Sequence, residues 1–361
     1  MKKSIIFIVW QILLLSWLVF SQEVIENRIE LSRKLKASDV WLEKELEIGG
    51  QKQEGEYLFE DIRSFRVDEE GNIYVIDVKA KKLMKFDKQG KLVWKIGKTG
   101  QGPGEFQVLS GIELGKSNTL LLYDLGNWRI SYYSLEGGLK EEISVANKPI
   151  IHRVDDDSKG NLYVTIIIYE ETIKIKLLNK FDNRLNIAKE IYRKDEKFLP
   201  KEVNFYPIHI HFRVRSDDLI TYANSWEYVI YLADGEGKVK KIIRNKYKPV
   251  KYTEADKKRD FSEVFSDRTP SPEIKFIFPD YYPPIEHLLI DDQDNIFVRT
   301  YERTKDGAHY YDYFDAEGRY IASFPMKETI FCIRGNRFYT LEEDEEGYQK
   351  IVRYRYRLKL R

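Results

Sequence analysis

Short runs of alternating apolar and polar residues recur along most of the chain, and tight-turn residues separate them. The clearest unit has one run at residues 65–67, a turn at 70–72, a second run at 73–76 and two further runs joined by a turn at 87–90. Period-two alternation is typical of strands with one buried face, and glycine or asparagine between two such runs is typical of a hairpin. Four consecutive antiparallel strands of this kind predict a propeller blade.

The unit recurs with decreasing fidelity, and six inner hairpins can be counted along the chain. We therefore predict an all-β fold, a six-bladed β-propeller of four-stranded antiparallel blades. In the fourth and fifth units the turn glycine is missing, and we expect Asp217 and Asp294 to take its place. The sixth unit lacks its outermost strand. The alternating segment 40–48 is expected to supply it, because this pairing closes the ring and removes two open sheet edges.

The first unit carries the residues that suggest a family. At 68–74 and 86–90, and in the following segment 96–106, the sequence resembles the NHL-repeat family of six-bladed propellers, in particular its exported bacterial members. The resemblance implies a scaffold that binds ligands, and it specifies no reaction. The glycines of residues 100–106 are expected to let the chain cross between blades, since a strand rather than a helix follows them.

Extra chain separates the fourth and fifth units, at about residues 244–284. Residues 253–256 have the pattern of a capping box at the start of a short helix, and a segment rich in proline and aromatic residues follows. The insertion is expected either to pack on the outside of its own blade or to lie over one mouth of the central channel. In the second case, four aromatic side chains are candidates for contact with a partner: Phe276, Phe278, Tyr281 and Tyr282.

The N-terminal end differs in composition from the rest of the chain. Two lysines precede an apolar run from residue 5 to residue 20, and a charged stretch follows. This pattern predicts a signal peptide at residues 1–21, removed after Ser21. The mature propeller, residues 22–361, would then be exported to the periplasm or cell surface of a bacterium, without membrane insertion. The alternative is that the apolar segment is retained as an anchor.

Charge and cysteine content narrow the choice of partners. The chain has 60 Lys and Arg against 59 Asp and Glu, and both signs are interleaved. A nucleic-acid partner is therefore not expected, because nucleic-acid-binding domains carry a basic patch or stripe. The single cysteine, Cys332, excludes an intrachain disulfide and multi-cysteine zinc sites. Acidic pairs at 155–157, 217–218 and 291–292 fall at hairpin turns, so we interpret them as turn residues rather than as calcium ligands.

The innermost strand of each blade lines the central channel of a propeller. Alignment of the six units on their turns places polar residues of successive blades at one level. These candidate ligand-binding residues are Arg63, Ser110, His152, Ile210 or His211, Glu286 and Thr329, with His209 and His287 close by.

Two functional hypotheses follow from this candidate mouth. The leading one is a non-enzymatic binding protein without a cofactor, which presents the mouth and the insertion to a protein, peptide or glycan partner. The histidines support the alternative, because imidazole groups can hold a metal ion or exchange protons near neutral pH. A six-bladed relative, the alpha-amidating lyase of peptide hormones, binds zinc in this way. The alternative function is a metal-dependent lyase or lactonase-like hydrolase that acts on a small ligand in the channel.

Overall fold

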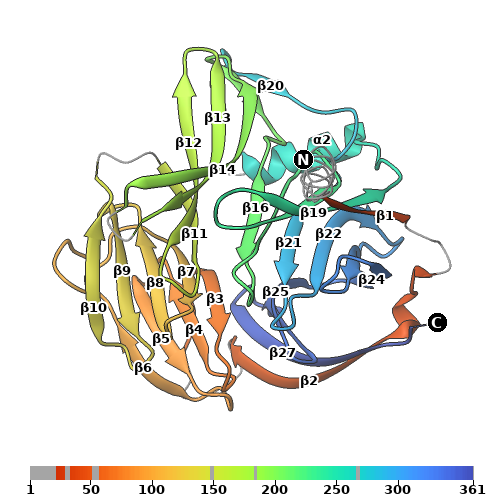
Figure 1. Ribbon diagram of the computed structural model, residues 1–361. Coiled ribbons are helices and arrows are strands. Elements are labelled where there is room, and N and C mark those ends of the chain that lie inside the picture. Colours follow the sequence, from red (N-terminus) through yellow and green to blue (C-terminus); the bar gives the residue numbers. More distant parts are fainter. Residues whose placement is uncertain are drawn as a thin grey trace, which may run out of the picture.

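Six antiparallel four-stranded blades are arranged around a central axis, as the sequence predicts (Figure 1). The computed structural model describes residues 22–360 except 29–32, 51–56, 147–149, 183–184 and 266–268. The predicted signal peptide lies outside the described residues. Within them, every helix is too short or too polar to cross a membrane.

The strands follow the predicted order, with the innermost strand of each blade first in the chain. The first three blades consist of β3 (Ile62–Val67), β4 (Ile73–Asp77), β5 (Lys82–Phe86) and β6 (Leu92–Ile96); β7 (Leu109–Gly115), β8 (Thr119–Asp124), β9 (Arg129–Ser134) and β10 (Leu139–Ser144); β11 (Ile150–Asp156), β12 (Leu162–Glu170), β13 (Ile173–Phe181) and β14 (Ile187–Lys197). The last three consist of β16 (Ile210–Val214), β17 (Ile220–Asn224), β18 (Val229–Ala233) and β19 (Val239–Lys246); β21 (His287–Ile290), β22 (Ile296–Arg303), β23 (His309–Phe314) and β24 (Tyr320–Met326); β25 (Thr329–Arg334), β26 (Arg337–Glu343), β27 (Gln349–Leu358) and β2 (Val40–Gly49).

The hydrophobic core is divided into six clusters, and each cluster lies between two neighbouring blades. Successive side chains of a strand point to opposite faces of its sheet, so a strand in the middle of a blade contributes to two clusters. β4 and β8 are accordingly buried along their whole lengths. Because every blade shares its core with both neighbours, the stability of each blade depends on a closed ring.

An aspartate holds the innermost hairpin in several blades. The carboxylate of Asp68 accepts hydrogen bonds from the N–H of Asn72 at 2.8 Å and from the hydroxyl of Tyr74 at 2.9 Å. In blade three, Asp157 binds Asn161 and Tyr163 in the same way. Asp157 and, in blade five, Asp291 therefore act as turn residues, as predicted. The prediction is wrong for Asp155, which lies in strand β11 two residues before the turn and faces Arg213 instead.

The turns of blades four and five show one correction to the prediction. In blade one, Gly71 has a positive φ of 86°, and the residues that replace it are Asp218 with 63° and Asp294 with 62°. The prediction of Asp294 is confirmed, whereas that of Asp217 is wrong by one residue. The turn of blade four starts at Arg215, whose carbonyl accepts the N–H of Asp218, so Asp218 occupies the position of the glycine.

The N-terminal strand β2 closes the sixth blade, as predicted from residues 40–48. It pairs antiparallel with β27 along almost its whole length. Ile48 is buried in the core between blades six and one. The carboxylate of Glu45 accepts a hydrogen bond from Arg337 at 2.7 Å and lies 3.2 Å from Arg353. Hydrogen bonds, apolar contacts and ion pairs therefore all fasten β2 to the last blade.

A further N-terminal strand, β1 (Glu23–Arg28), has no counterpart in the prediction. It pairs in parallel with β19 as a fifth, outermost strand of blade four. The side chain of Asn27 donates a hydrogen bond to the carbonyl of Gly318 and accepts one from the N–H of Tyr320, which joins β1 to blade five. A short parallel edge strand depends on distant partners, so its own six residues carry little signal.

The insertion between blades four and five has a small aromatic core. Helix α2 (Glu254–Val264) begins after Thr253, whose hydroxyl accepts a hydrogen bond from the N–H of Asp256, as the capping box predicts. Strand β20 (Lys275–Ile277) pairs in parallel with β15 (Glu202–Asn204), which precedes blade four. Both elements lie at the upper end of the molecule in Figure 1.

Candidate functional site

The two ends of the channel differ in structure. The innermost strands, such as β16 and β21, run downward in Figure 1 from an upper mouth, on the side of the insertion, to a lower mouth formed by their hairpin turns. The residues predicted from the sequence lie at the beginnings of these strands and therefore at the upper mouth.

Arg63 and Ser110 lie together at the upper mouth. Both line a cavity of about 190 Å³ beside β3, β7 and β11, which we call the upper pocket. The side chain of Arg63 is exposed, and the Ser110 hydroxyl donates a hydrogen bond to the carbonyl of Tyr123 at 3.3 Å. The backbone of His152 belongs to β11, but its side chain lies outside the described part of the structure.

Three other predicted histidines form a group between blades four and five. The rings of His211 and His287 meet edge to face with centroids 5.8 Å apart, and the ring of His209 lies 6.4 Å from that of His211. Burial lowers the pKa of His211 to about 3 and also lowers that of His287. Both rings are therefore neutral near pH 7. In the described part of the chain, no group of three His, Cys, Asp or Glu side chains could hold a metal ion.

Glu286 and Thr329 form a third group, joined by Arg299. The Nε of Arg299 lies 3.1 Å from the carboxylate of Glu286, and a terminal nitrogen donates a hydrogen bond to the Thr329 hydroxyl at 3.0 Å. The Nδ1 of His309 also lies 2.9 Å from this carboxylate. The predicted mouth residues with described side chains thus form three local groups of two or three rather than one ring.

The aromatic residues of the insertion are mostly engaged within the protein. Phe276 and Phe278 pack on Phe205, and Tyr282 is only 6% exposed and accepts a hydrogen bond from Arg259. Tyr281 is 49% exposed. The upper pocket is lined by residues of blades one to three, so the insertion forms none of its walls.

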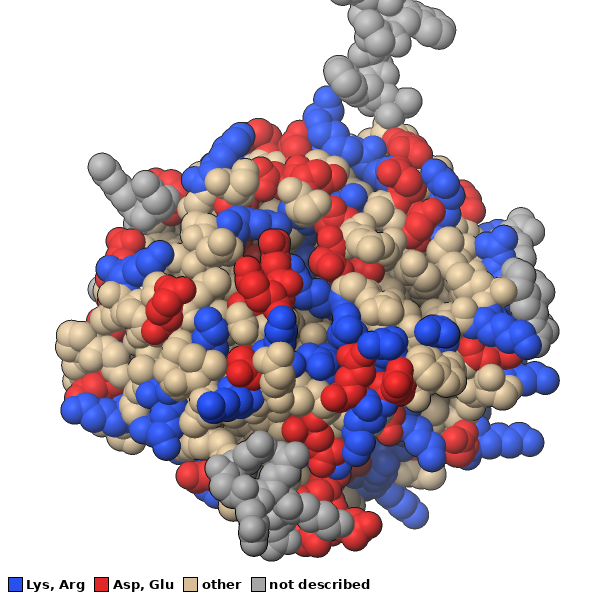
Figure 2. Space-filling view, turned by 90° about the horizontal axis from the view of Figure 1, so that it is seen from below, with Lys and Arg blue, Asp and Glu red and all other residues tan. Residues whose placement is uncertain are grey.

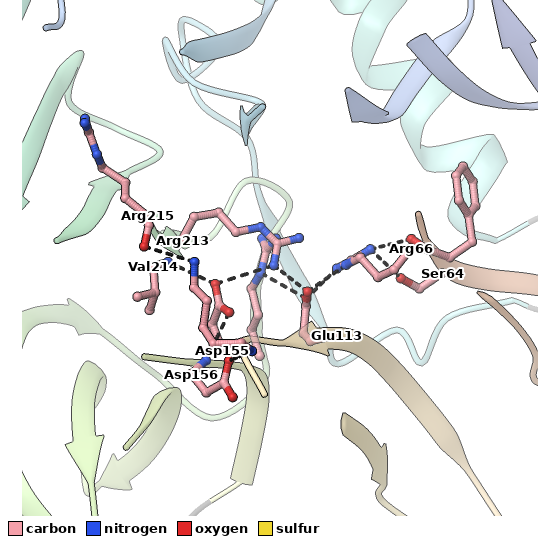
Figure 3. Close-up of polar contacts among 11 residues, drawn as sticks. Ser64, Arg66, Glu113, Asp155, Asp156, Arg213, Val214 and Arg215 are labelled. Carbon is pink, nitrogen blue, oxygen red and sulfur yellow. Dashed lines mark hydrogen bonds and ion pairs between the residues drawn. The ribbon is translucent and has the colours of Figure 1, made fainter. Parts of the chain in front are cut away.

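Five charged side chains of the innermost strands meet in the channel beside the upper pocket, and Figure 3 labels four of them. These residues, which we call the central ion cluster, are Arg66, Glu113, Arg153, Asp155 and Arg213. Glu113 accepts hydrogen bonds from Nε of Arg66 at 2.6 Å and from terminal nitrogens of Arg66 and Arg213. Asp155 lies 3.7 Å from Arg213 and accepts the N–H of Val214 at 2.9 Å.

The electrostatics of the cluster keep the Glu113 carboxylate ionised, and the arginines outnumber the acidic side chains. Burial alone would raise the pKa of Glu113, but Arg213 and Arg66 outweigh this effect and lower it to about 2. Burial, together with the nearby Arg213, lowers the pKa of Arg153 to about 9. At neutral pH the cluster therefore holds three guanidinium groups and two acidic side chains. Glu113 cannot exchange protons in this range, so it acts as a fixed charge.

The sequence contains a signal for this cluster that the mouth-level alignment does not use. Arg66, Glu113, Asp155 and Arg213 occupy the same position in four successive innermost strands, two residues before the turn. Blade five has Leu289 at this position, which is the residue type that a buried innermost strand normally requires. Charged side chains at an otherwise apolar position, recurring with the repeat, indicate that they meet in the channel.

The central ion cluster divides the channel. Arg66 and Glu113 line both the upper pocket and a second pocket of about 250 Å³ below it, which also contains Asp155 and Arg213. The upper pocket combines polar groups with apolar residues of the core between blades two and three, namely Leu121, Ile130 and Val154. It can therefore bind a ligand that has both a polar and an apolar part.

At the lower mouth, turn carboxylates join neighbouring blades. Asp218 accepts the N–H and hydroxyl of Ser158, and Asp294 accepts those of Ser216. Seen from below, basic and acidic side chains are interspersed over the molecule (Figure 2). Asp218 and Asp294 therefore help to hold neighbouring blades together at the lower mouth.

The fold agrees with what comparison with known proteins shows. A family model described as a six-bladed beta-propeller matches residues 54–276 of the chain. A search of curated protein sequences found no match.

Two solved structures share the fold over most of their lengths. A putative exported protein from Bacteroides fragilis is 13% identical, with a TM-score of 0.59, and the match covers 92% of this chain and 99% of the other. A DUF4221 family member from Bacteroides vulgatus is 12% identical, with a TM-score of 0.52 and coverages of 90% and 100%. At such identities the likeness shows the fold alone.

Proposed function

Because the chain belongs to the six-bladed beta-propeller family DUF5128, whose fold specifies no reaction, we propose its function from the site: an exported binding protein that holds its ligand in the upper pocket. The ligand would be a group presented by a protein, peptide or glycan partner. The observation that carries this proposal is a pocket with polar and apolar walls whose floor is the central ion cluster.

The charge state of the site favours binding over acid–base catalysis. The arginines keep Glu113 ionised, with a pKa of about 2, while burial keeps His211 neutral, with a pKa of about 3. A general acid or base works best with a pKa near the working pH. Glu113 can therefore position a ligand in the pocket, and neither group is suited to transfer protons.

Filling the pocket tests the proposal. A Cβ atom built on Gly111 would meet nothing within 4 Å, and this glycine lies in the pocket wall. Gly111→Leu should therefore fill the cavity without strain. In a ligand-observed NMR screen of a mixed fragment library, we expect fragments that bind the wild type and lose binding in Gly111→Leu, with equal thermal stability of the two proteins. A screen without such fragments would contradict the proposal.

Export is a separate part of the proposal. The lysine-led apolar segment before residue 22 supports it, as does the description of a structural neighbour as a putative exported protein. N-terminal sequencing of the protein from its native host should give Gln22 as the first residue. A mature protein that begins at Met1 would instead support the anchor alternative.

A further inference from the structure

The upper pocket contains more positive charge than its own carboxylate neutralises. The carboxylate of Glu113 accepts hydrogen bonds from Arg66 and Arg213, whereas Nε of Arg153 approaches this carboxylate only to 3.8 Å. Within the described residues, the Arg153 guanidinium has no hydrogen-bond partner, although its side chain is only 20% exposed. A buried charge without full compensation is costly, and natural sites usually supply a partner.

Arg63 adds a second cation at the entrance of the same pocket. Its side chain is exposed, and it has no ion pair among the described residues. Arg63 and Arg153 come from β3 and β11, so they reach the pocket from different blades. Arginine binds carboxylates with two parallel hydrogen bonds, and such bonds are stronger than those between neutral groups.

The remaining walls define the rest of the ligand. The apolar part of the lining consists of Leu121, Ile130 and Val154, and Gly111, which has no side chain, leaves open space in the pocket wall. A cavity of about 190 Å³ limits the buried part of a ligand to a short apolar group and its anion.

Resting on the proposed function, we propose that the upper pocket binds a carboxylate joined to a short apolar group, with the carboxylate on Arg153 and Arg63 and the apolar group against Leu121, Ile130 and Val154. Two sources share this chemistry: the C-terminal residue of a peptide that ends in an apolar side chain, and a free small acid. The carboxylate of either ligand would supply a negative charge next to Arg153.

Matched probes isolate the charge. N-acetyl-leucine and N-acetyl-leucinamide differ only in the carboxylate, and N-acetyl-glycine lacks the apolar side chain. By titration calorimetry or NMR, we expect N-acetyl-leucine to bind at least about tenfold more tightly than either of the others. A tripeptide ending in leucine and 4-methylpentanoate distinguish the two sources: tighter binding of the tripeptide identifies a peptide end, and tighter binding of 4-methylpentanoate identifies a free acid.

Variants test the assignment of the two arginines. Arg153→Met and Arg63→Met should each weaken binding of N-acetyl-leucine about tenfold and leave binding of the amide unchanged. The control Arg193→Met removes a cation from the outer strand β14 and should change neither affinity. Equal affinities for acid and amide, both lost in Gly111→Leu, would overturn this inference while the proposed function stands. If neither the probes nor any fragment binds, both are overturned.

Discussion

The free energy of unfolding of the Glu113→Gln variant is expected to be about 3–5 kcal/mol lower than that of the wild type. Glu113 is 9% exposed, and its carboxylate is the common partner of Arg66, Arg213 and, at longer range, Arg153. Glutamine keeps the size of the side chain but leaves buried guanidinium groups without their counter-charge. Urea denaturation of the two proteins measures the difference. Glu70 is an exposed turn residue, so the free energy of unfolding of the control variant Glu70→Gln should differ from that of the wild type by less than about 0.5 kcal/mol.

A second substitution shows whether the cost is electrostatic. Removal of Arg153 in the Glu113→Gln background should recover part of the lost stability, because one uncompensated charge disappears with it. Arg153→Met alone is expected to be close to neutral, since Arg66 and Arg213 still neutralise Glu113. If Glu113→Gln costs less than about 1 kcal/mol, the cluster does not hold the channel together.

The difference in stability between wild type and Glu113→Gln should depend on pH in a defined direction. The pKa of Glu113 is lowered to about 2 in the folded protein, so its ionised form stabilises the fold above its ordinary pKa. This contribution is lost as the pH falls through the range between the ordinary value and about 2. The gap in stability between wild type and Glu113→Gln should therefore narrow when the pH is lowered from about 6 to about 3.

Removal of strand β2 is expected to destabilise the protein strongly. A protein that starts at residue 50 lacks the outer strand of blade six, the buried side chain of Ile48 and the ion pairs of Glu45. We expect its melting temperature to fall by roughly 10 °C or more, with aggregation through the exposed edge of β27. Differential scanning fluorimetry and light scattering provide the two measurements.

A matched deletion controls for loss of chain length. A protein that starts at residue 33 lacks β1, the fifth strand of blade four, but keeps β2. Its stability should fall much less, because β19 already belongs to a complete blade. A synthetic peptide of residues 37–50 should restore the shorter protein in part. If the two deletions lower the melting temperature equally, ring closure by β2 is not what stabilises the fold.

Most of the fold could be predicted from the sequence because the blade is a local repeat. Alternation, turn residues and the unpaired segment 40–48 predict six blades and their closure, and pairings between neighbours in the chain follow from them. β1 and the parallel pair of β15 and β20 are different, because these short strands lie outside the repeat and no unit lacks a strand that they would supply. Local patterns do not encode such pairings.

The candidate site was harder to predict because it depends on which side chains meet across the channel. Arg63 and Ser110 do line one pocket, but the histidines and the Glu286 group lie elsewhere on the ring. The central ion cluster was not predicted, although its residues occupy equivalent positions in their strands. The sequence of one blade shows that a charged residue occupies its innermost strand. Which residue of another blade it contacts follows only from the closed ring.

Pairing between the two ends of the chain has a consequence for the time course of biosynthesis. Glu45 and Arg337, which join β2 to the last blade, are 292 residues apart in the chain. A ribosome that adds about 5–20 residues per second makes the second of them some 15–60 s after the first. During that interval the first segment has no partner, and the growing polypeptide cannot reach its final topology. A translocation machine that needs an unfolded substrate would have this interval in which to engage it.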